Sequence, residues 1–153
     1  MEDCAERQRE VQSRLKYNHM LGGEVIGASF EDQSVTYRYP LSPWEADESG
    51  EIRAGILVTI VDSASGTFMG SVCGTGSATA GIDAVPVREA YLGQHIIAEA
   101  RLIHAGCRLL QASCTLTCEE TGETVMESSS LWVRSGREAH GPKAPGNEEG
   151  GAE

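Results

Sequence analysis

The chain contains 153 residues, of which 40% are hydrophobic and 23% are charged, and its formal net charge at pH 7 is -11. This length predicts one domain that can bury a core without support from a metal or a disulfide. The acidic excess argues against binding to nucleic acid or to an anionic membrane surface, because both partners attract basic patches.

The cysteines and histidines predict neither a disulfide framework nor a metal site. The five cysteines are odd in number and form no Cys-x-x-Cys pair with nearby histidines, which favours reduced thiols in a cytoplasmic protein. The histidines are scattered without metal-ligand spacing: His19, His95, His104 and His140. We expect no metal and no cofactor. Acidic and basic residues within the first ten positions also argue against a secretory signal.

Residues 1–20 predict a separate amino-terminal helix. Its apolar residues recur one to two turns apart, between charged ones: Val11, Leu15 and Met20. Gly22 and Gly23 then break the helix. The main domain is therefore expected to begin at residue 21.

The next segment predicts a β-hairpin and a loop. Residues 24–30 and 34–40 have the composition of strands and are separated by a polar turn. Residues 42–51 are polar and rich in turn formers, and they lead the chain into a helix that starts near Ala54. We expect this loop to lie beside the amino terminus of the helix.

A single charged residue, Asp62, interrupts the apolar run from Ala54 to Ile82. Residues 54–74 are long enough to cross a membrane, but Asp62 and several Ser, Thr and Gly residues favour a helix packed in a soluble core. Burying an unpaired carboxylate there would cost several kcal/mol. Asp62 is therefore either satisfied by neighbouring hydroxyl groups, such as those of Thr59, Ser63 or Ser65, or placed beside water that it uses in catalysis.

Four extended stretches after the helix predict long antiparallel strands: residues 78–88, 95–104, 108–119 and 124–134. Pro86 cannot donate to a sheet ladder, so the first stretch is expected at a sheet edge or at a bulge. Residues 136–153 are rich in Gly, Pro and Glu and predict a disordered tail. Residues 21–135 thus predict an α+β fold, an antiparallel sheet wrapped around a long central helix.

The segment before and inside the helix carries a motif. Residues 47–55 read Asp-Glu-Ser-Gly-Glu-Ile-Arg-Ala-Gly, and Asp62 follows nine residues after Arg53. This frame resembles the Asn-x-x-Gly-x-x-His-Gly-Gly motif, with a later Asp, of hotdog-fold acyl-CoA thioesterases in the phenylacetyl-CoA thioesterase-like branch. The identities kept are Gly50, Gly55 and Asp62. The departures are Asp47, Arg53 and Ala54.

The resemblance implies thioester hydrolysis with Asp62 as the base that activates water or as the nucleophile. The backbone N–H groups of Ala54 and Gly55, at the helix amino terminus, would hold the oxyanion. A Ser or Thr near the thioester carbonyl would align at Thr79 or Ala80.

Two of the three departures from the motif, Asp47 and Arg53, would change the side chains that contact the substrate. Asp47 stands at the Asn position and Arg53 at the His position. Arg53 cannot act as a general base. It either adds positive charge near the substrate or forms a plain ion pair with Asp47 or another acid.

Helix geometry predicts a site shared between two chains. The nine residues from Arg53 to Asp62 span roughly 13 Å at about 1.5 Å per residue. One thioester cannot contact both ends, so Asp62 would come from a second chain across a two-fold axis. The resemblance likewise implies a dimer or a dimer of dimers.

Coenzyme A would bring phosphates to an acidic protein, so local basic residues must hold them. Four arginines are candidates: Arg88, Arg101, Arg108 and Arg134. We select Arg88, which ends a strand, and Arg108, in a turn where similar proteins often place a basic residue near the nucleotide. The alternative for each is a solvated charge at a strand end.

The leading hypothesis is a cytoplasmic acyl-CoA thioesterase that forms homo-oligomers. The alternative is a hotdog protein that binds an acyl-CoA or a similar small ligand without turnover, because the His and Asn positions of the motif are replaced. A dehydratase or hydratase ranks last, since that chemistry usually needs a His near the helix.

Overall fold

The structure is a computed structural model that describes residues 16–73 and 76–134, together with Glu6 and Arg9. Its elements in chain order are α2 (Lys16–Leu21), β1 (Glu24–Ser29), β2 (Ser34–Pro40), η1 (Pro43–Glu45), α3 (Ala54–Cys73), β3 (Ser77–Pro86), β4 (His95–Ala105), β5 (Leu109–Cys118) and β6 (Thr124–Arg134). Most of the predicted amino-terminal helix and the predicted tail, 136–153, lie outside the described residues.

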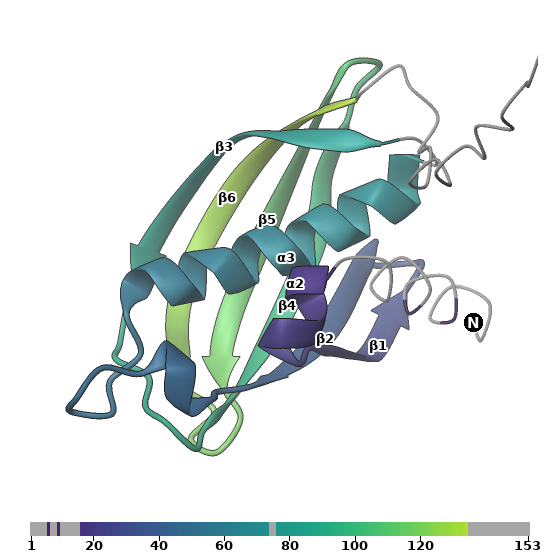
Figure 1. The fold of residues 1–153 in the computed structure, drawn as a ribbon. Helices are drawn as coiled ribbons and strands as arrows, with labels where there is room; N and C mark the ends of the chain where they lie inside the picture. Colours follow the sequence, from purple (N-terminus) through teal and green to yellow (C-terminus); the bar gives the residue numbers. More distant parts are fainter. Residues whose placement is uncertain (1–5, 7–8, 10–15, 74–75, 135–153) are drawn as a thin grey trace, which may run out of the picture.

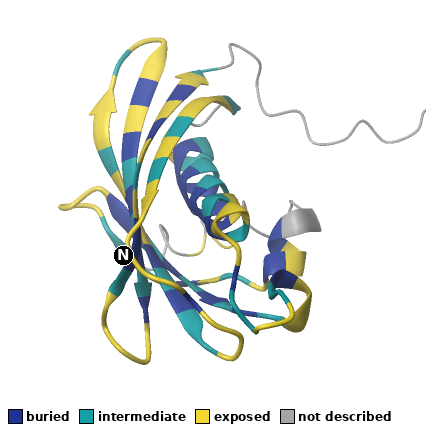
Figure 2. Ribbon diagram, turned by 90° about the vertical axis from the view of Figure 1, so that its left-hand side faces the viewer, coloured by how far each residue is buried: buried dark blue, intermediate teal, exposed yellow. Residues whose placement is uncertain are grey.

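The six strands form one antiparallel sheet in the order β1-β2-β4-β5-β6-β3, and α3 lies across its concave face (Figure 1). This confirms the predicted α+β hotdog architecture. Alternation in β5 shows why these segments are strands: Leu110, Ala112, Cys114 and Leu116 are buried beneath the helix, and the residues between them face outward. Figure 2 shows the buried residues concentrated where helix and sheet meet.

One face of α3 supplies the centre of the core. Its buried apolar residues are spaced three to four positions apart or lie next to such positions: Leu57, Ile60, Val61, Ala64, Phe68 and Met69. Gly66 lets the helix approach β6 closely, because a Cβ there would lie 3.0 Å from Cη2 of Trp132. The indole Nε1 of Trp132 donates to Ser130 Oγ at 2.8 Å, so this large buried ring also has its polar group satisfied.

Among the described residues, one helix is long and apolar enough to cross a membrane, the segment Ala54–Val72 with a mean hydropathy of 1.3. Half of that window is buried inside the protein, and the helix packs against β3, β4 and β5. It is the core helix of the domain, as its Asp, Ser, Thr and Gly content predicted.

Strand β3 forms a sheet edge, as Pro86 predicted. It pairs only with β6 among the described strands, Pro86 is its last residue, and its register shifts between Thr79 and Gly81. Seven of its ten residues are exposed, and Asp83 is its one charged residue. The free edge of β3 therefore presents a long and nearly uncharged backbone ladder.

Buried hydrogen bonds connect the short helix α2 to α3. Asn18 is 2% exposed; its Oδ1 accepts from Ser63 Oγ at 2.5 Å, and its Nδ2 donates to Thr67 Oγ1 at 3.4 Å. Tyr39 of β2 also donates to Ser63 Oγ, at 3.4 Å. This network occupies the hydroxyl groups of Ser63 and Thr67 on the inner side of α3 and holds the helix in one rotation about its axis.

Candidate active site

Asp62 lies partly buried on α3 and faces the edge strand β3. Thr79 Oγ1 donates a hydrogen bond to Asp62 Oδ1 at 2.9 Å. Of the two positions aligned from sequence, Thr79 and Ala80, the structure thus brings the threonine to the carboxylate. A carboxylate that keeps access to solvent and is oriented by one hydroxyl group has the arrangement of a general base or a nucleophile.

The hydroxyl group that reaches Asp62 is that of Thr79 and not that of Ser63 or Thr59, two of the neighbours that the sequence offered. Ser63 points into the core and donates to Asn18, whereas Thr59 Oγ1 donates to the carbonyl of Gly55 at 2.9 Å. The reason is helical geometry, because successive residues are turned by about 100° about the helix axis. Ser63, the residue after Asp62, therefore faces the core. The hydroxyl group that bonds to Asp62 comes from Thr79 of β3.

The amino terminus of α3 is accessible and is a candidate anion site. Ala54 and Gly55 are both exposed, and a Cβ at Gly55 would have no atom within 4 Å. The first N–H groups of a helix have no acceptor within it, and the helix dipole adds positive potential there. The backbone N–H groups of Ile56 and Leu57 donate to the carbonyl of Arg53 at 2.9 and 3.4 Å, which defines where the helix begins.

Asp47 accepts hydrogen bonds that stabilise the turn before the amino terminus of α3. Its Oδ1 accepts from Ser49 N at 2.9 Å, Ser49 Oγ at 2.6 Å and Glu51 N at 3.2 Å. These hydrogen bonds, led by the Ser49 hydroxyl, lower the pKa of Asp47 below its usual range. Arg53 Nε lies 3.5 Å from Asp47 Oδ2, so the structure shows the ion-pair alternative for Arg53, with the guanidinium largely exposed.

A second loop supports the same turn. Ile52 N donates to the carbonyl of Ala90 at 2.8 Å, and Leu92 N donates to the carbonyl of Gly50 at 2.8 Å. Gly50 has a φ of +83°, a conformation that favours glycine. The loop after β3 is thus held against the entrance to α3.

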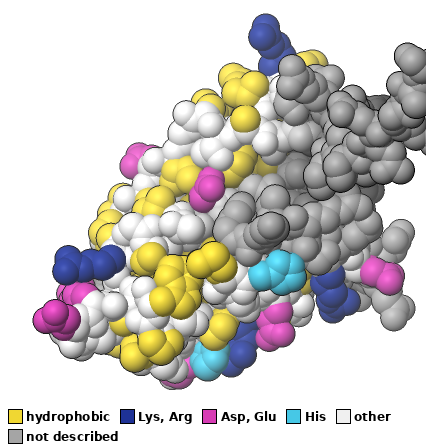
Figure 3. Space-filling model, viewed as in Figure 1, with side chains coloured by type: hydrophobic (Ala, Val, Ile, Leu, Met, Phe, Trp, Pro, Cys, Tyr) yellow, Lys and Arg dark blue, Asp and Glu magenta, His cyan; other side chains and the backbone are white. Residues whose placement is uncertain are grey.

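Apolar side chains are exposed on these two loops. Trp44 is 53% exposed, Tyr91 47% and Leu92 44%. In Figure 3 apolar side chains gather with charged ones at the end of the molecule where η1 lies. Trp44 therefore does not anchor its loop by burial, and this end offers an apolar surface beside the helix terminus.

The predicted coenzyme A arginines lie at opposite ends of the sheet. Arg88 N donates to the carbonyl of Val125, at the start of β6, and its Nη2 lies 3.3 Å from Glu123 Oε1. The Arg108 carbonyl accepts from Arg134 N at the other end of β6. The 11 residues of β6 span roughly 35 Å, so a single chain does not bring the two arginines together.

Glu45 is a buried carboxylate that the sequence analysis did not select. It ends η1 and is 3% exposed. Its Oε2 accepts from Ser42 N at 2.5 Å, and no described donor reaches Oε1. Burial raises the pKa of Glu45. The sequence signal for it is the Ser-x-x-Glu spacing of a capping box.

Glu45→Gln is expected to stabilise the fold increasingly as pH rises above 4.5, the ordinary pKa of glutamate. Because the folded-state pKa is raised, protonated Glu45 favours the folded state at low pH, and this contribution is lost as pH rises through the folded pKa. Glutamine keeps an acceptor for Ser42 N without the charge. Urea unfolding midpoints from pH 4 to pH 8 measure the effect. Glu48→Gln, at an exposed position in the same loop, is the control, and an equal gain in both variants would contradict the prediction.

No protein-family model and no curated protein matches the sequence. The fold does match solved structures. A hypothetical thioesterase from Streptococcus pneumoniae, solved with coenzyme A, is 16% identical with a TM-score of 0.73 over 86% of this chain and 99% of that chain. The Escherichia coli PaaI protein from the phenylacetic acid degradation operon is 14% identical with a TM-score of 0.75 over 88% and 97%.

Thioesterase superfamily member 2 from Mus musculus is 18% identical with a TM-score of 0.74 over 84% of this chain and 96% of that chain. In each comparison nearly the whole of the other chain is covered. The chain therefore shares the hotdog fold of these solved structures over nearly their whole length.

Proposed function

We propose that the chain is an acyl-CoA thioesterase in which Asp62 is the base or the nucleophile. The observation that carries the proposal is the Asp62–Thr79 hydrogen bond on the central helix of a thioesterase-type fold. The anion site at Ala54 and Gly55 supports it, because hydrolysis develops negative charge on the thioester oxygen.

Hydrolysis of the thioester needs only water and the side chains and backbone groups of this site, without a cofactor. As a base, Asp62 takes a proton from water, and the resulting hydroxide adds to the thioester carbonyl. The backbone N–H groups of Ala54 and Gly55 stabilise the oxyanion. When the C–S bond breaks, the coenzyme A thiolate leaves and takes up the proton that Asp62 holds, which regenerates the base, and a carboxylic acid is released. As a nucleophile, Asp62 would instead form an anhydride that water then hydrolyses. In both cases Thr79 orients the carboxylate.

The complete site requires a second copy of the chain. Asp62 lies eight residues along α3 from Ala54, roughly 12 Å at 1.5 Å per residue. We propose that the exposed edges of two β3 strands pair across a two-fold axis, which continues the sheet and brings Asp62 of one protomer toward the helix terminus of its partner. The length and low charge of β3 support this pairing. Two such dimers would associate in a dimer of dimers.

Arg108 is the better candidate for a coenzyme A phosphate. It is exposed, and no acidic group among the described residues pairs with it, whereas Arg88 is engaged by Glu123. An unpaired guanidinium is available for a phosphate without breaking an existing contact. The exposed Trp44 and Tyr91 offer an apolar surface for the acyl group.

Binding without turnover is the second candidate function. The observation that favours it is the Arg53–Asp47 ion pair at the His and Asn positions of the resembled motif, where Asp47 is further engaged by hydrogen bonds from Ser49. In that case the helix terminus would still hold a carbonyl or a phosphate, and Asp62 would only orient bound water.

Release of free thiol from short, medium, long and aromatic acyl-CoA esters tests the proposal. We expect the purified protein to hydrolyse at least one class faster than the uncatalysed reaction. If no ester in the panel is hydrolysed while coenzyme A esters bind, the thioesterase proposal is wrong and the binding function replaces it.

A further inference from the structure

Helix α2 brings one side chain, Asn18, into contact with two hydroxyl groups of α3 (Figure 1). Asn18 is 2% exposed, and its partners Ser63 and Thr67 are buried about one helical turn apart. Its Oδ1 accepts from Ser63 Oγ at 2.5 Å, and its Nδ2 donates to Thr67 Oγ1 at 3.4 Å. One contact alone would let α3 rotate or slide, whereas contacts on two successive turns restrict both movements.

Two glycines determine where α2 lies. Gly22 N donates to the Asn18 carbonyl at 3.0 Å and ends the helix with a φ of +65°, a conformation that favours glycine. A Cβ at Gly23 would overlap the ring of Tyr39, so any larger residue there would have to displace this buried ring. Tyr39 itself donates to Ser63 Oγ at 3.4 Å. The turn after α2 therefore brings Asn18 and Tyr39 to the same hydroxyl group of α3.

The residue before Ser63 on α3 is Asp62, and it faces a different element. Successive helical residues are turned by about 100° about the axis, so Ser63 faces α2 and β2 while Asp62 faces β3. Thr79 Oγ1 donates to Asp62 Oδ1 at 2.9 Å. The rotation of α3 that forms the buried hydrogen bond to Asn18 is therefore the rotation that directs Asp62 at Thr79.

The position of the Asp62 carboxylate is sensitive to this rotation. A Cα atom lies about 2.3 Å from the helix axis, and side-chain atoms extend to roughly 5 Å. Turning the helix by about 10° would then move the carboxylate by roughly 1 Å. A displacement of this size breaks a hydrogen bond of 2.9 Å, and it can cost about 10²-fold in the rate of a reaction.

We propose that Asn18 is a positioning residue for Asp62. By bonding to two successive turns of α3, it holds the rotation that directs Asp62 at Thr79. The inference rests on the proposed function, in which Asp62 is the base or the nucleophile. Asn18 acts through the helix and does not contact the substrate. Helix α2 is thus a working part of the catalytic domain and more than a cover for its core.

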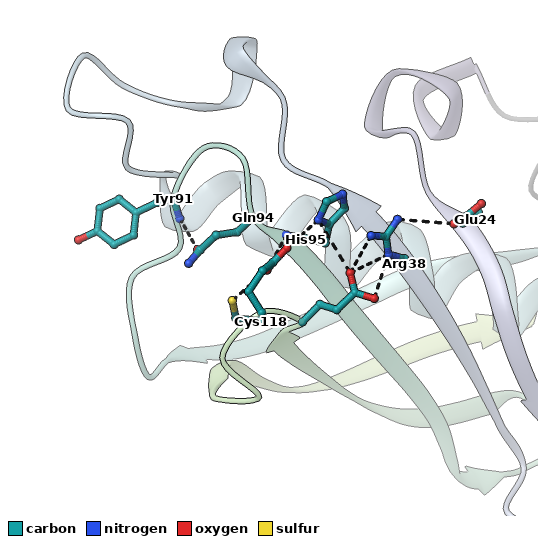
Figure 4. A network of polar contacts seen from close by, with 8 residues as sticks. Glu24, Arg38, Tyr91, Gln94, His95 and Cys118 are labelled. Atoms are coloured by element: carbon teal, nitrogen blue, oxygen red, sulfur yellow. Dashed lines mark hydrogen bonds and ion pairs between the residues drawn. The ribbon is translucent and has the colours of Figure 1, made fainter.

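A second polar network offers a control, because it joins strands of the sheet (Figure 4). Arg38 Nη1 of β2 lies 3.9 Å from Glu24 of β1, and the guanidinium binds both carboxylate oxygens of Glu119 at 2.7 to 3.0 Å. In the same network His95 Nδ1 lies 2.7 Å from Glu120 Oε1. None of these contacts involves α2 or α3. Arg38→Gln therefore removes ion pairs from the sheet and leaves the contacts between the two helices in place.

Steady-state kinetics of Asn18→Ala and Ser63→Ala with a hydrolysed acyl-CoA ester test the proposal. We expect each variant to lower kcat by at least about tenfold and to keep KM within about twofold, because neither side chain binds the ester. Ser63→Ala removes only a hydroxyl group, so it provides the test if the cavity left by Asn18→Ala prevents folding. The double variant should lose no more than the larger single loss, since both changes release the same contact. Arg38→Gln should keep the wild-type kcat, and an equal loss there would overturn the proposal.

A double-mutant cycle gives a second readout that does not depend on turnover. Thr79→Val removes the hydrogen bond to Asp62 and keeps the branched shape, and the fall in the urea unfolding midpoint measures that loss. We expect this fall to be clearly smaller in the Ser63→Ala background, where Asp62 is no longer held at Thr79. If the wild-type protein hydrolyses no ester, the proposed function fails and the cycle alone decides whether the network directs Asp62. Additive effects in the cycle, or a wild-type kcat in both Asn18→Ala and Ser63→Ala, would overturn the positioning role.

Discussion

Asp62→Asn is expected to lower the turnover number for acyl-CoA hydrolysis by roughly 10²–10⁴-fold, the usual contribution of a general base. Asparagine has nearly the same shape and still accepts a hydrogen bond from Thr79, but it cannot take a proton from water. The dissociation constant for a non-hydrolysable acyl-CoA analogue should stay within a few-fold of the wild-type value. Thiol release and equilibrium binding measure the two effects separately.

Asp83→Asn is the matched control for Asp62→Asn. Asp83 is an exposed carboxylate on β3, the same strand that carries Thr79, and its replacement makes the same change in net charge. We expect wild-type turnover from it. Equal losses in both variants would assign the effect to charge near the edge of the sheet, and a fully active Asp62→Asn variant would remove Asp62 from the chemistry.

Much of the fold could be predicted from the sequence because its local signals agree. Strand composition, alternation and turn residues located each strand to within about two residues, and Pro86 indicated a sheet edge or a bulge, of which β3 forms the edge. Asp62 stood out because it is the only charged residue of α3. Its threonine partner could be aligned only to Thr79 or Ala80, since the bulge between Thr79 and Gly81 changes which side chain faces the helix.

Other features depend on contacts that the sequence does not show. Glu45 is buried because its loop packs against the domain, although the sequence around it has the composition of an exposed turn. His95 and Glu120 are 25 positions apart, so their hydrogen bond follows only from the β4–β5 register. Arg88 follows β3 and Arg108 precedes β5. Only the position of each beside one end of β6 shows that they lie at opposite ends of the sheet.

Mixing two inactive variants tests whether the site is shared between protomers. Gly55→Pro removes one N–H group of the proposed oxyanion site, and proline is tolerated in the first turn of a helix. Gly55→Ala keeps that N–H group and places its Cβ in open space, so it should remain active and serve as the control. Gly55→Pro and Asp62→Asn alone should both be nearly inactive.

When the Gly55→Pro and Asp62→Asn chains are dissociated together and allowed to reassociate, half of the dimers contain one chain of each kind. In such a heterodimer one site combines the intact Asp62 of the first chain with the intact helix terminus of the second. The mixture should regain about one quarter of wild-type activity, because a two-fold dimer has two equivalent sites. If native mass spectrometry shows heterodimers and no activity returns, Asp62 and the helix terminus do not act together across the interface. Thioester hydrolysis by the wild-type protein would then have to use groups from a single chain, which the roughly 12 Å between Ala54 and Asp62 makes difficult for one carbonyl.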